Sequence, residues 1–263
     1  MQMPVERGSD EPPPQASPGV PGEGVKSISR ASKPQLALPR RTVTTWRTLG
    51  TLPPRRMQNV FLIDHPVIQT KLTELRDYMA DHTEFRTLLD EIAMLMTYEV
   101  TRDWPTQVKP VQTPLEKTTG RVLARRVTLV PILRAGLGMA DGVLKILPDA
   151  RMGHLGVRRD ESTLEPIAYY QKLPPDIGDT EVLLIDPMLA TGGSAIAAVS
   201  FLKNAGVQNM KFVCLVAAPE GVDALHKQHP EVPIYCAAID RQLNEKGYIL
   251  PGLGDAGDRI FGT

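Results

Sequence analysis

The stretch from Val182 to Ser194 constrains the fold more than any other part of the 263-residue sequence. It begins with four consecutive apolar residues, Val182 to Ile185, which is typical of a parallel strand covered on both faces. Asp186 follows, then a turn of small residues, and the apolar spacing after Ser194 predicts a helix that ends near Gly206. Such an order of strand, turn and helix brings backbone N–H groups together where they bind an anion.

The turn reads Pro187-Met188-Leu189-Ala190-Thr191-Gly192-Gly193-Ser194. Taken alone, it is equally typical of an ordinary corner between a strand and a helix. Two features favour a ligand site: an acid stands at the carboxyl end of the strand, where open α/β sheets bind ligands, and two hydroxyl side chains lie within the turn. The glycines are not followed by lysine, which excludes a Walker-type loop.

A second buried strand is predicted from Val127 to Leu133, and Arg134 follows it directly. Gly136 and Gly138 would let the backbone approach a ligand closely. A guanidinium at the carboxyl end of a strand offers an always-charged fork for phosphate oxygens. The alternative is a surface charge at a turn.

Further strands are predicted at residues 152–157, 212–218 and 234–239, with helices between them. Before them, Asp81 and Glu84 resemble a capping box at the start of an amphipathic helix that runs to Glu99. Residues 101–126 show no period and are expected to be irregular. Strands alternating with helices predict an α/β fold, a mostly parallel sheet flanked by helices.

The first 56 residues differ in composition from the rest, with ten of the 24 prolines and nine of the 30 lysines and arginines. They are predicted to be a disordered extension before a domain at residues 57–263. An organelle transit peptide, a dispensable extension and a misassigned start before Met57 remain alternatives. The domain carries a net charge of about −5, which argues against a general nucleic-acid binder. No apolar run is long enough to span a membrane.

The C-terminal residues include Gly252, Gly254 and Gly257, spaced as G-x-G-x-x-G. A dinucleotide site is rejected, because that motif must open a helix inside a βαβ unit and only six residues follow Gly257. The segment can instead wrap a small planar ligand and present its own main-chain donors and acceptors. The alternative is a flexible tail.

Four motifs together resemble the uracil phosphoribosyltransferase family of type I phosphoribosyltransferases. They are M-Q-N-V-F-L-I-D-H-P at 57–66, V-P-I-L-R-A-G-L-G-M at 130–139, D-P-M-L-A-T-G-G-S at 186–194 and the glycine-rich segment at 247–263. The resemblance implies transfer of a phosphoribosyl group from 5-phospho-α-D-ribose 1-diphosphate (PRPP) to uracil, in pyrimidine salvage. It also implies the type I phosphoribosyltransferase fold for residues 57–263.

The resemblance assigns roles residue by residue. Catalysis is expected from Asp186, Arg134 and Arg159, with Asp186 on the ribose and the two arginines on the diphosphate. Arg158 stands where the family usually has an apolar or aromatic residue, so either arginine is a candidate for that contact. PRPP is expected at Arg134, Arg159, Asp186, Pro187, Met188, Leu189, Ala190, Thr191, Gly192, Gly193, Ser194 and Asp255, and uracil at Ile249, Gly254, Asp255 and Ala256.

The implied cofactor is Mg²⁺, held through PRPP and water rather than by a protein metal site. The resemblance further implies a homo-oligomer, dimeric or larger, and GTP is a candidate activator. Cys214 and Cys236 lie in apolar runs without a disulfide or zinc pattern, which fits a reducing cytoplasm. Two rival functions remain: an RNA-binding regulator that senses PRPP or nucleotides on the same fold, and a phosphoribosyltransferase for another base.

Overall fold

The described part of the protein is built around a central sheet. The computed structural model describes residues 59–159 and 166–263. The extension predicted for residues 1–56 lies outside these residues, and so do residues 160–165. In the described part the sheet runs in the order β1-β11-β10-β8-β4-β6-β7, with β5 beside β4 and β9 beside β10. Their bounds are β1 Val60–Leu62, β4 Val127–Leu133, β5 Arg151–Met152, β6 His154–Arg159, β7 Pro166–Lys172, β8 Glu181–Ile185, β9 Met188–Leu189, β10 Asn209–Ala217 and β11 Ile234–Ile239.

The prediction of a mostly parallel α/β sheet is confirmed. Within this sheet, the described strand pairs are all parallel except β6 with β7, which is antiparallel. The register pairs Pro131 of β4 with Ile185 of β8, and Ile185 with Val213 of β10. The strands β4 and β8 therefore end at the same edge of the sheet, and Arg134 and Asp186 follow these two neighbouring strands.

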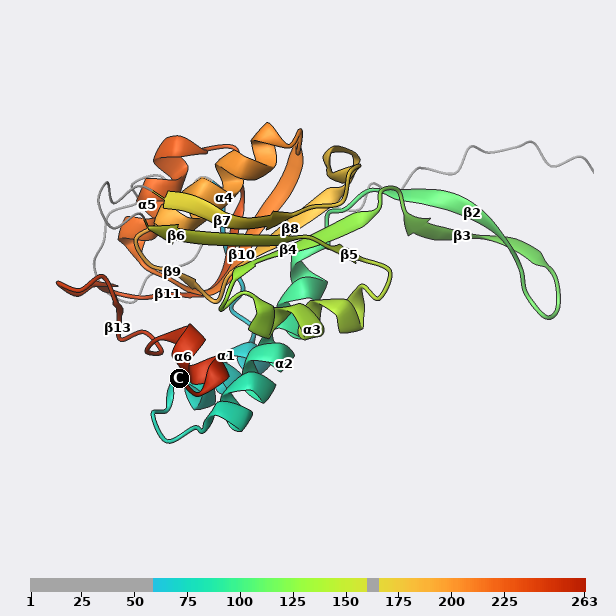
Figure 1. Cartoon of the computed structure of the whole chain (residues 1–263). Helices are drawn as coiled ribbons and strands as arrows, with labels where there is room; N and C mark the ends of the chain where they lie inside the picture. The colour runs from blue at the N-terminus through green and yellow to red at the C-terminus, as the bar shows by residue number, and fades with distance from the viewer. Residues whose placement is uncertain (1–58, 160–165) are drawn as a thin grey trace, which may run out of the picture. The chain divides into compact units, whose positions relative to one another are not determined.

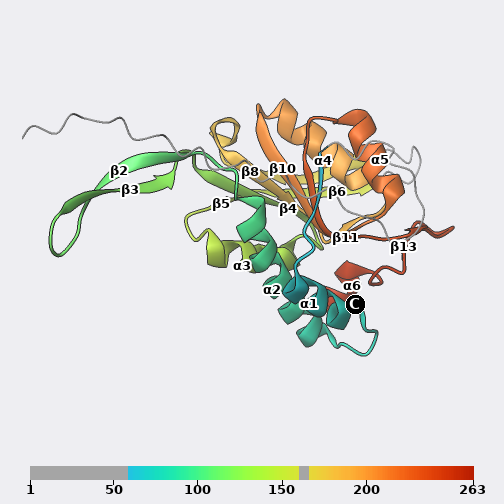
Figure 2. The same ribbon diagram turned by 180° about the vertical axis from the view of Figure 1, so that it is seen from behind.

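Helices cover the two faces of this sheet (Figures 1 and 2). One layer holds α1 (Pro66–Arg76), α2 (His82–Val100), α3 (Leu137–Ile146) and α6 (Ala256–Phe261), and the other holds α4 (Gly193–Asn204) and α5 (Pro219–Gln228). Alternate residues of β8 divide between them: Leu183 and Ile185 belong to the first core, Val182 and Leu184 to the second. An unbroken apolar strand is needed because both faces are buried.

Two helix termini were predicted correctly from the sequence. Asp81 caps α2, its Oδ1 accepting hydrogen bonds from the N–H groups of Thr83 (2.7 Å) and Glu84 (2.9 Å). Gly206 follows α4 with φ of 88°, and its N–H donates to the carbonyl of Lys203 at 2.9 Å. This left-handed conformation favours glycine after a helix.

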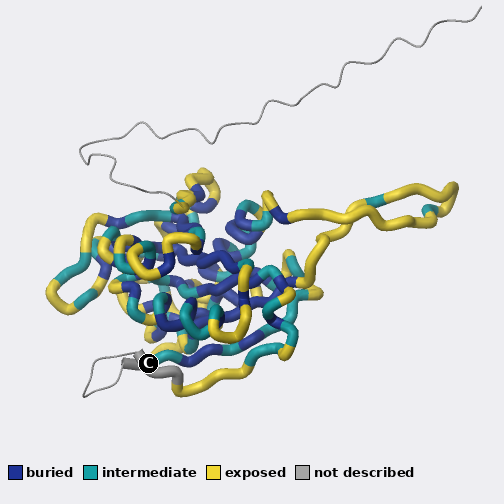
Figure 3. The backbone as a smooth tube through the Cα atoms, turned by 90° about the horizontal axis from the view of Figure 1, so that it is seen from above, coloured by how far each residue is buried: buried dark blue, intermediate teal, exposed yellow. Residues whose placement is uncertain are grey.

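The expectation of an irregular segment at residues 101–126 is wrong. The chain there forms an antiparallel hairpin of β2 (Thr106–Gln112) and β3 (Lys117–Leu123), which extends away from the sheet (Figure 1). Nearly every hairpin residue is exposed (Figure 3), so neither face needs the alternation of apolar and polar residues that identifies a half-buried strand. The pairing is set by the hairpin's own backbone hydrogen bonds.

The C-terminal part begins with a second, smaller hairpin. Its strands β12 (Gln242–Leu243) and β13 (Ile249–Leu250) are antiparallel, and the short helix α6 follows. A 3-10 helix at Ile177–Asp179 precedes β8. Among the described residues, none of the helices is both long and apolar enough to cross a bilayer.

Candidate active site

The turn after β8 encloses a small pocket at the carboxyl edge of the sheet. The pocket has a volume of about 90 Å³ and is lined by Asp186, Met188, Leu189, Ala190, Thr191, Gly192, Gly193, Ser194 and Ala195. Gly192 has φ of 84° and precedes α4, whose N-terminus has no side-chain cap. The structure thus brings together the acid, the turn and a helix N-terminus, an arrangement that suits a phosphate.

Neighbouring elements hold this turn from beneath. The carbonyl of Pro187 accepts hydrogen bonds from Leu215 (2.9 Å) and Val216 (3.1 Å), and that of Leu189 accepts one from Ala218 (2.8 Å). A Cβ atom on Gly221 of α5 would lie 2.3 Å from the carbonyl oxygen of Ala190, so α5 packs directly against the turn. These hydrogen bonds and the packing of α5 hold the backbone of the turn in place.

Asp186 lies where β8 ends, with its backbone N–H donating to the carbonyl of Val213 at 3.1 Å. Burial raises the pKa of its carboxyl from 3.8 to about 7, although a hydrogen bond from the N–H of Met188 lowers it. The negative charge of Asp255 raises the same pKa further. A carboxyl that titrates near neutral pH at a strand terminus is a strong functional candidate.

The loop after β4 lies against the end of β8. A Cβ atom on Gly136 would lie 2.6 Å from the carbonyl oxygen of Ile185, the residue before Asp186. A Cβ atom on Gly138 would lie 2.6 Å from the side chain of Leu89 and 2.9 Å from that of Ile260. The two glycines predicted to permit close approach thus serve contacts inside the protein, which place the Arg134 loop beside Asp186.

The side chain of Arg134 is 60% exposed and turns toward α6. Its Nη2 lies 3.9 Å from Oδ1 of Asp258, and its guanidinium lies 5.8 Å from the ring centre of Phe261. The solvent-facing guanidinium therefore remains open to an incoming anion. It also joins the β4 loop to the C-terminal segment.

The four predicted uracil-binding positions lie in that segment. The side chains of Ile249 and Ala256 are 5% and 0% exposed, and Gly254 has φ of 80°. Asp255 caps α6, its Oδ1 accepting a hydrogen bond from the N–H of Asp258 at 3.0 Å. Because the apolar side chains are buried in the core, a ligand at this segment meets main-chain groups.

Arg159 ends β6, and only its backbone is described. Its contact with diphosphate, and the choice between Arg158 and Arg159, stay predictions. Three functional candidates were not foreseen from the sequence: Arg76, Asp240 and Arg259, which bind the backbone of the C-terminal segment.

The side-chain atoms around the pocket that could coordinate a metal are the oxygen atoms of Asp186, Thr191 and Ser194. Oxygen is the kind of ligand that Mg²⁺ prefers. Within residues 59–159 and 166–263, no group of three or more His, Cys, Asp or Glu side chains could hold a metal ion by itself. Asp186 lines the pocket, and the charge of Asp255 acts on Asp186.

A mostly parallel sheet, with an acid and a turn suited to a phosphate at its carboxyl edge, is the arrangement expected of a type I phosphoribosyltransferase fold. A family model described as uracil phosphoribosyltransferase matches residues 62–263. The chain belongs to the uracil phosphoribosyltransferase family.

Similar proteins extend this comparison. Proteins named uracil phosphoribosyltransferase are 60% identical over 205 residues in Dictyoglomus turgidum and 59% identical over 210 residues in Lactococcus lactis subsp. lactis. These alignments cover 78% and 79% of this chain and 99% and 100% of the relatives. A solved structure of an Aquifex aeolicus protein is 36% identical, with a TM-score of 0.73 over 77% of this chain and 97% of that one.

Proposed function

We propose that the protein transfers the phosphoribosyl group of PRPP to uracil, giving UMP and diphosphate. The observation that carries this proposal is the meeting of three segments at one sheet edge: the Asp186 turn, the Arg134 loop and the C-terminal segment. The family and the relatives named uracil phosphoribosyltransferase support the same reaction.

PRPP would lie across the carboxyl ends of β4 and β8. The 5-phosphate fits the pocket of residues 186–195, where the uncapped N-terminus of α4 supplies N–H groups and a positive dipole end. The ionised carboxylate of Asp186 would accept hydrogen bonds from the ribose hydroxyls. Arg134 and Arg159 would bind the diphosphate, and Asp255 would face PRPP from the other side.

In the reaction, N1 of uracil bonds to the anomeric carbon as the bond to the diphosphate oxygen breaks, its electron pair leaving with diphosphate. The uracil N1 proton is released, and we assign no side chain as its acceptor. Positive charge grows on the ribose ring, so catalysis depends on alignment of the substrates and on neutralising the leaving group. Asp186 would stabilise the ring cation, and the arginines would stabilise the diphosphate.

Mg²⁺ is the proposed cofactor, and it would neutralise charge on the diphosphate oxygens. It would be held through PRPP and water rather than by a closed protein site. The carboxylates of Asp186 and Asp255 would contribute negative charge beside it.

Uracil would bind to main-chain groups around Ile249, Gly254 and Ala256. The burial of the Ile249 and Ala256 side chains supports this mode, because it leaves backbone groups at the ligand. Two further proposals rest on the family: assembly into dimers or larger homo-oligomers, and activation by GTP. A cytoplasmic location is supported by two buried, unpaired cysteines, Cys214 and Cys236.

The test mixes the protein with Mg²⁺, PRPP and one nucleobase at a time, and measures diphosphate and nucleotide. Among the natural nucleobases, we expect stoichiometric diphosphate and nucleotide with uracil only. Turnover with a purine instead would assign another base. RNA binding without turnover would assign the protein as a regulator.

A further inference from the structure

The C-terminal segment, residues 247–263, is attached to the rest of the protein by a largely buried ion pair. Nη1 and Nη2 of Arg76, in the last turn of α1, lie 2.7 and 2.8 Å from the two carboxylate oxygens of Asp240, which follows β11. The side chains are 21% and 6% exposed. Two parallel charged hydrogen bonds of this kind fix orientation as well as distance.

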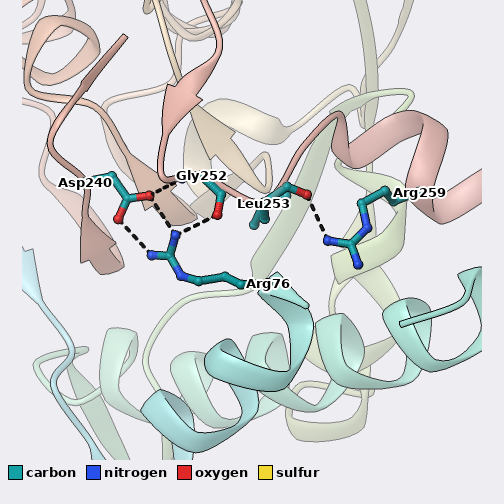
Figure 4. A network of polar contacts seen from close by, with 5 residues as sticks. All are labelled: Arg76, Asp240, Gly252, Leu253 and Arg259. Atoms are coloured by element: carbon teal, nitrogen blue, oxygen red, sulfur yellow. Dashed lines mark hydrogen bonds and ion pairs between the residues drawn. The ribbon is translucent and has the colours of Figure 1, made fainter. Parts of the chain in front are cut away.

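The same pair binds both main-chain groups of Gly252 (Figure 4). Nη1 of Arg76 donates to the Gly252 carbonyl at 2.7 Å, and the Gly252 N–H donates to Oδ2 of Asp240 at 2.8 Å. A buried ion pair adds little to stability by itself, because desolvation offsets the attraction. Its hydrogen bonds to one glycine instead indicate a role in placing the backbone.

Gly252 needs such support, since its conformation is restricted on two grounds. Its φ is 64°, and a Cβ atom there would lie 2.1 Å from the carbonyl oxygen of Ile249. The chain therefore folds back on Ile249 at this point. The Arg76 and Asp240 bonds hold it there, between the proposed uracil-binding positions Ile249 and Gly254.

Arg259 of α6 holds the next residue. Its Nη1 donates to the carbonyls of Leu253 (2.9 Å) and Leu75 (2.8 Å), and its guanidinium lies 4.3 Å from the ring centre of Phe85. The consecutive carbonyls of Gly252 and Leu253 are thus both bound by arginines, at the C-terminal end of α1. They are directed toward the protein, so the groups left to meet a ligand are those of the flanking residues.

We infer that Arg76 and Asp240 are positioning residues that set the affinity for the base through Gly252, without touching it. This inference rests on the proposed function, because it takes the segment from Ile249 to Ala256 as the part that reads uracil. Main-chain recognition has no side chain that can adjust, so a displaced backbone misplaces every hydrogen bond at once. Misplacement by about 1 Å can cost on the order of a hundredfold in rate.

The kinetic test uses Arg76→Lys, which keeps the charge but cannot form the two-pronged pair and also bind Gly252. We expect KM for uracil and for 5-fluorouracil to rise at least fivefold, with KM for PRPP within twofold of the parent.

The matched control is Arg151→Lys. Arg151 is 35% exposed and bonds Asp176 at 2.6 Å, and its strand β5 pairs with Thr128 near the start of β4, away from the site. It should leave both KM values unchanged. An unchanged KM for uracil in Arg76→Lys would overturn the inference, as would equal rises for both substrates.

A second measurement does not depend on the reaction. Amide hydrogen exchange of the ligand-free protein should be at least tenfold faster at Gly252 and its neighbours in Arg76→Lys than in the parent, with β4 unchanged. Asp240→Asn keeps the shape of the side chain but removes an acceptor, and it should raise the exchange rate at Gly252 in the same way. If the parent shows no uracil transfer, the proposed function fails. The exchange measurement still tests whether Arg76 and Asp240 hold Gly252 in place. Unchanged exchange would overturn the inference, because it would show that the pair does not hold Gly252 in place. If both variants fail to fold while Arg151→Lys folds, the pair serves the fold alone.

Discussion

The backbone of Gly136 and the carbonyl of Ile185 are so close that a Cβ atom on Gly136 would lie 2.6 Å from that oxygen. The same Cβ atom would lie 2.7 Å from the backbone N and O of Ile132. Since Arg134 and Asp186 each lie within two residues of this contact, it sets the spacing between the proposed diphosphate and ribose sites.

Gly136→Ala is expected to separate these two loops, because the neighbours are backbone atoms that cannot swing aside. Overpacking of this kind costs about 1 to 3 kcal/mol of stability. We expect kcat/KM for PRPP to fall at least a hundredfold in the protein that remains folded. The control is Gly120→Ala in β3, whose Cβ would meet Val111 at an ordinary 3.5 Å. Equal kinetics for both variants would contradict this account.

Asp186 predicts a specific pH dependence of stability in the ligand-free protein. Its folded pKa of about 7 lies above the ordinary 3.8, so the folded state binds the extra proton. The resulting stabilisation is fully present below about pH 4 and is lost as the pH rises toward and through 7. Asp186→Asn removes this loss, so the variant should gain about 2 kcal/mol over the parent between pH 5 and pH 8. Urea unfolding at the two pH values measures the gap.

The exposed Asp149→Asn is the control for that experiment. A gap between Asp186→Asn and the parent that is the same at both pH values would show that Asp186 does not titrate in this range. The variant should also lose most turnover, since the amide cannot carry the charge proposed to stabilise the ribose cation.

Arg134→Ala should weaken PRPP use without unfolding the protein, because the side chain is 60% exposed. Loss of a charged hydrogen-bonding partner costs roughly 1.5 to 3 kcal/mol, or about ten- to a hundredfold in PRPP affinity or turnover. Steady-state kinetics would show it, with the hairpin variant Arg121→Ala as control. Parameters within twofold of the parent would remove Arg134 from the site.

Substitutions at Gly254 can be used to distinguish the effect of backbone strain from the effect of side-chain bulk. Its φ is 80°, yet a Cβ atom there would meet only the Cδ of Arg259 at 3.5 Å. Gly206 has φ of 88° with nothing within 4 Å of such an atom. Alanine at either position should cost about 1 to 2 kcal/mol through the left-handed conformation. Only Gly254→Ala should raise KM for uracil, and Gly254→Val should raise it further. A similar change of KM for uracil in Gly206→Ala would refute the assignment of Gly254 to the uracil site.

The elements that could be predicted from sequence are those whose pattern follows from burial. The bounds of β4 match the predicted Val127 to Leu133, because a strand covered on both faces must be apolar throughout. The hairpin β2–β3 could not be found in this way, since its residues face solvent on both sides.

The residues of the site also differ in whether the sequence could predict them. Asp186 and the turn could be predicted because strand, acid and glycines are adjacent in the chain. Arg76 and Asp240 are 164 residues apart, and each alone is an ordinary charged residue at the end of an element. Their role follows only from the fold, which brings α1 to the end of β11.

The central claim, that main-chain groups of the C-terminal segment read uracil, is tested most directly by comparing kcat/KM for uracil, 5-fluorouracil and cytosine. Cytosine reverses the polarity at N3 and at position 4, and each buried mismatch costs about 1 to 3 kcal/mol, so discrimination on the order of a thousandfold is expected. Fluorine leaves the pairing edge intact, so 5-fluorouracil should be used about as well as uracil. Efficient use of cytosine would contradict the account.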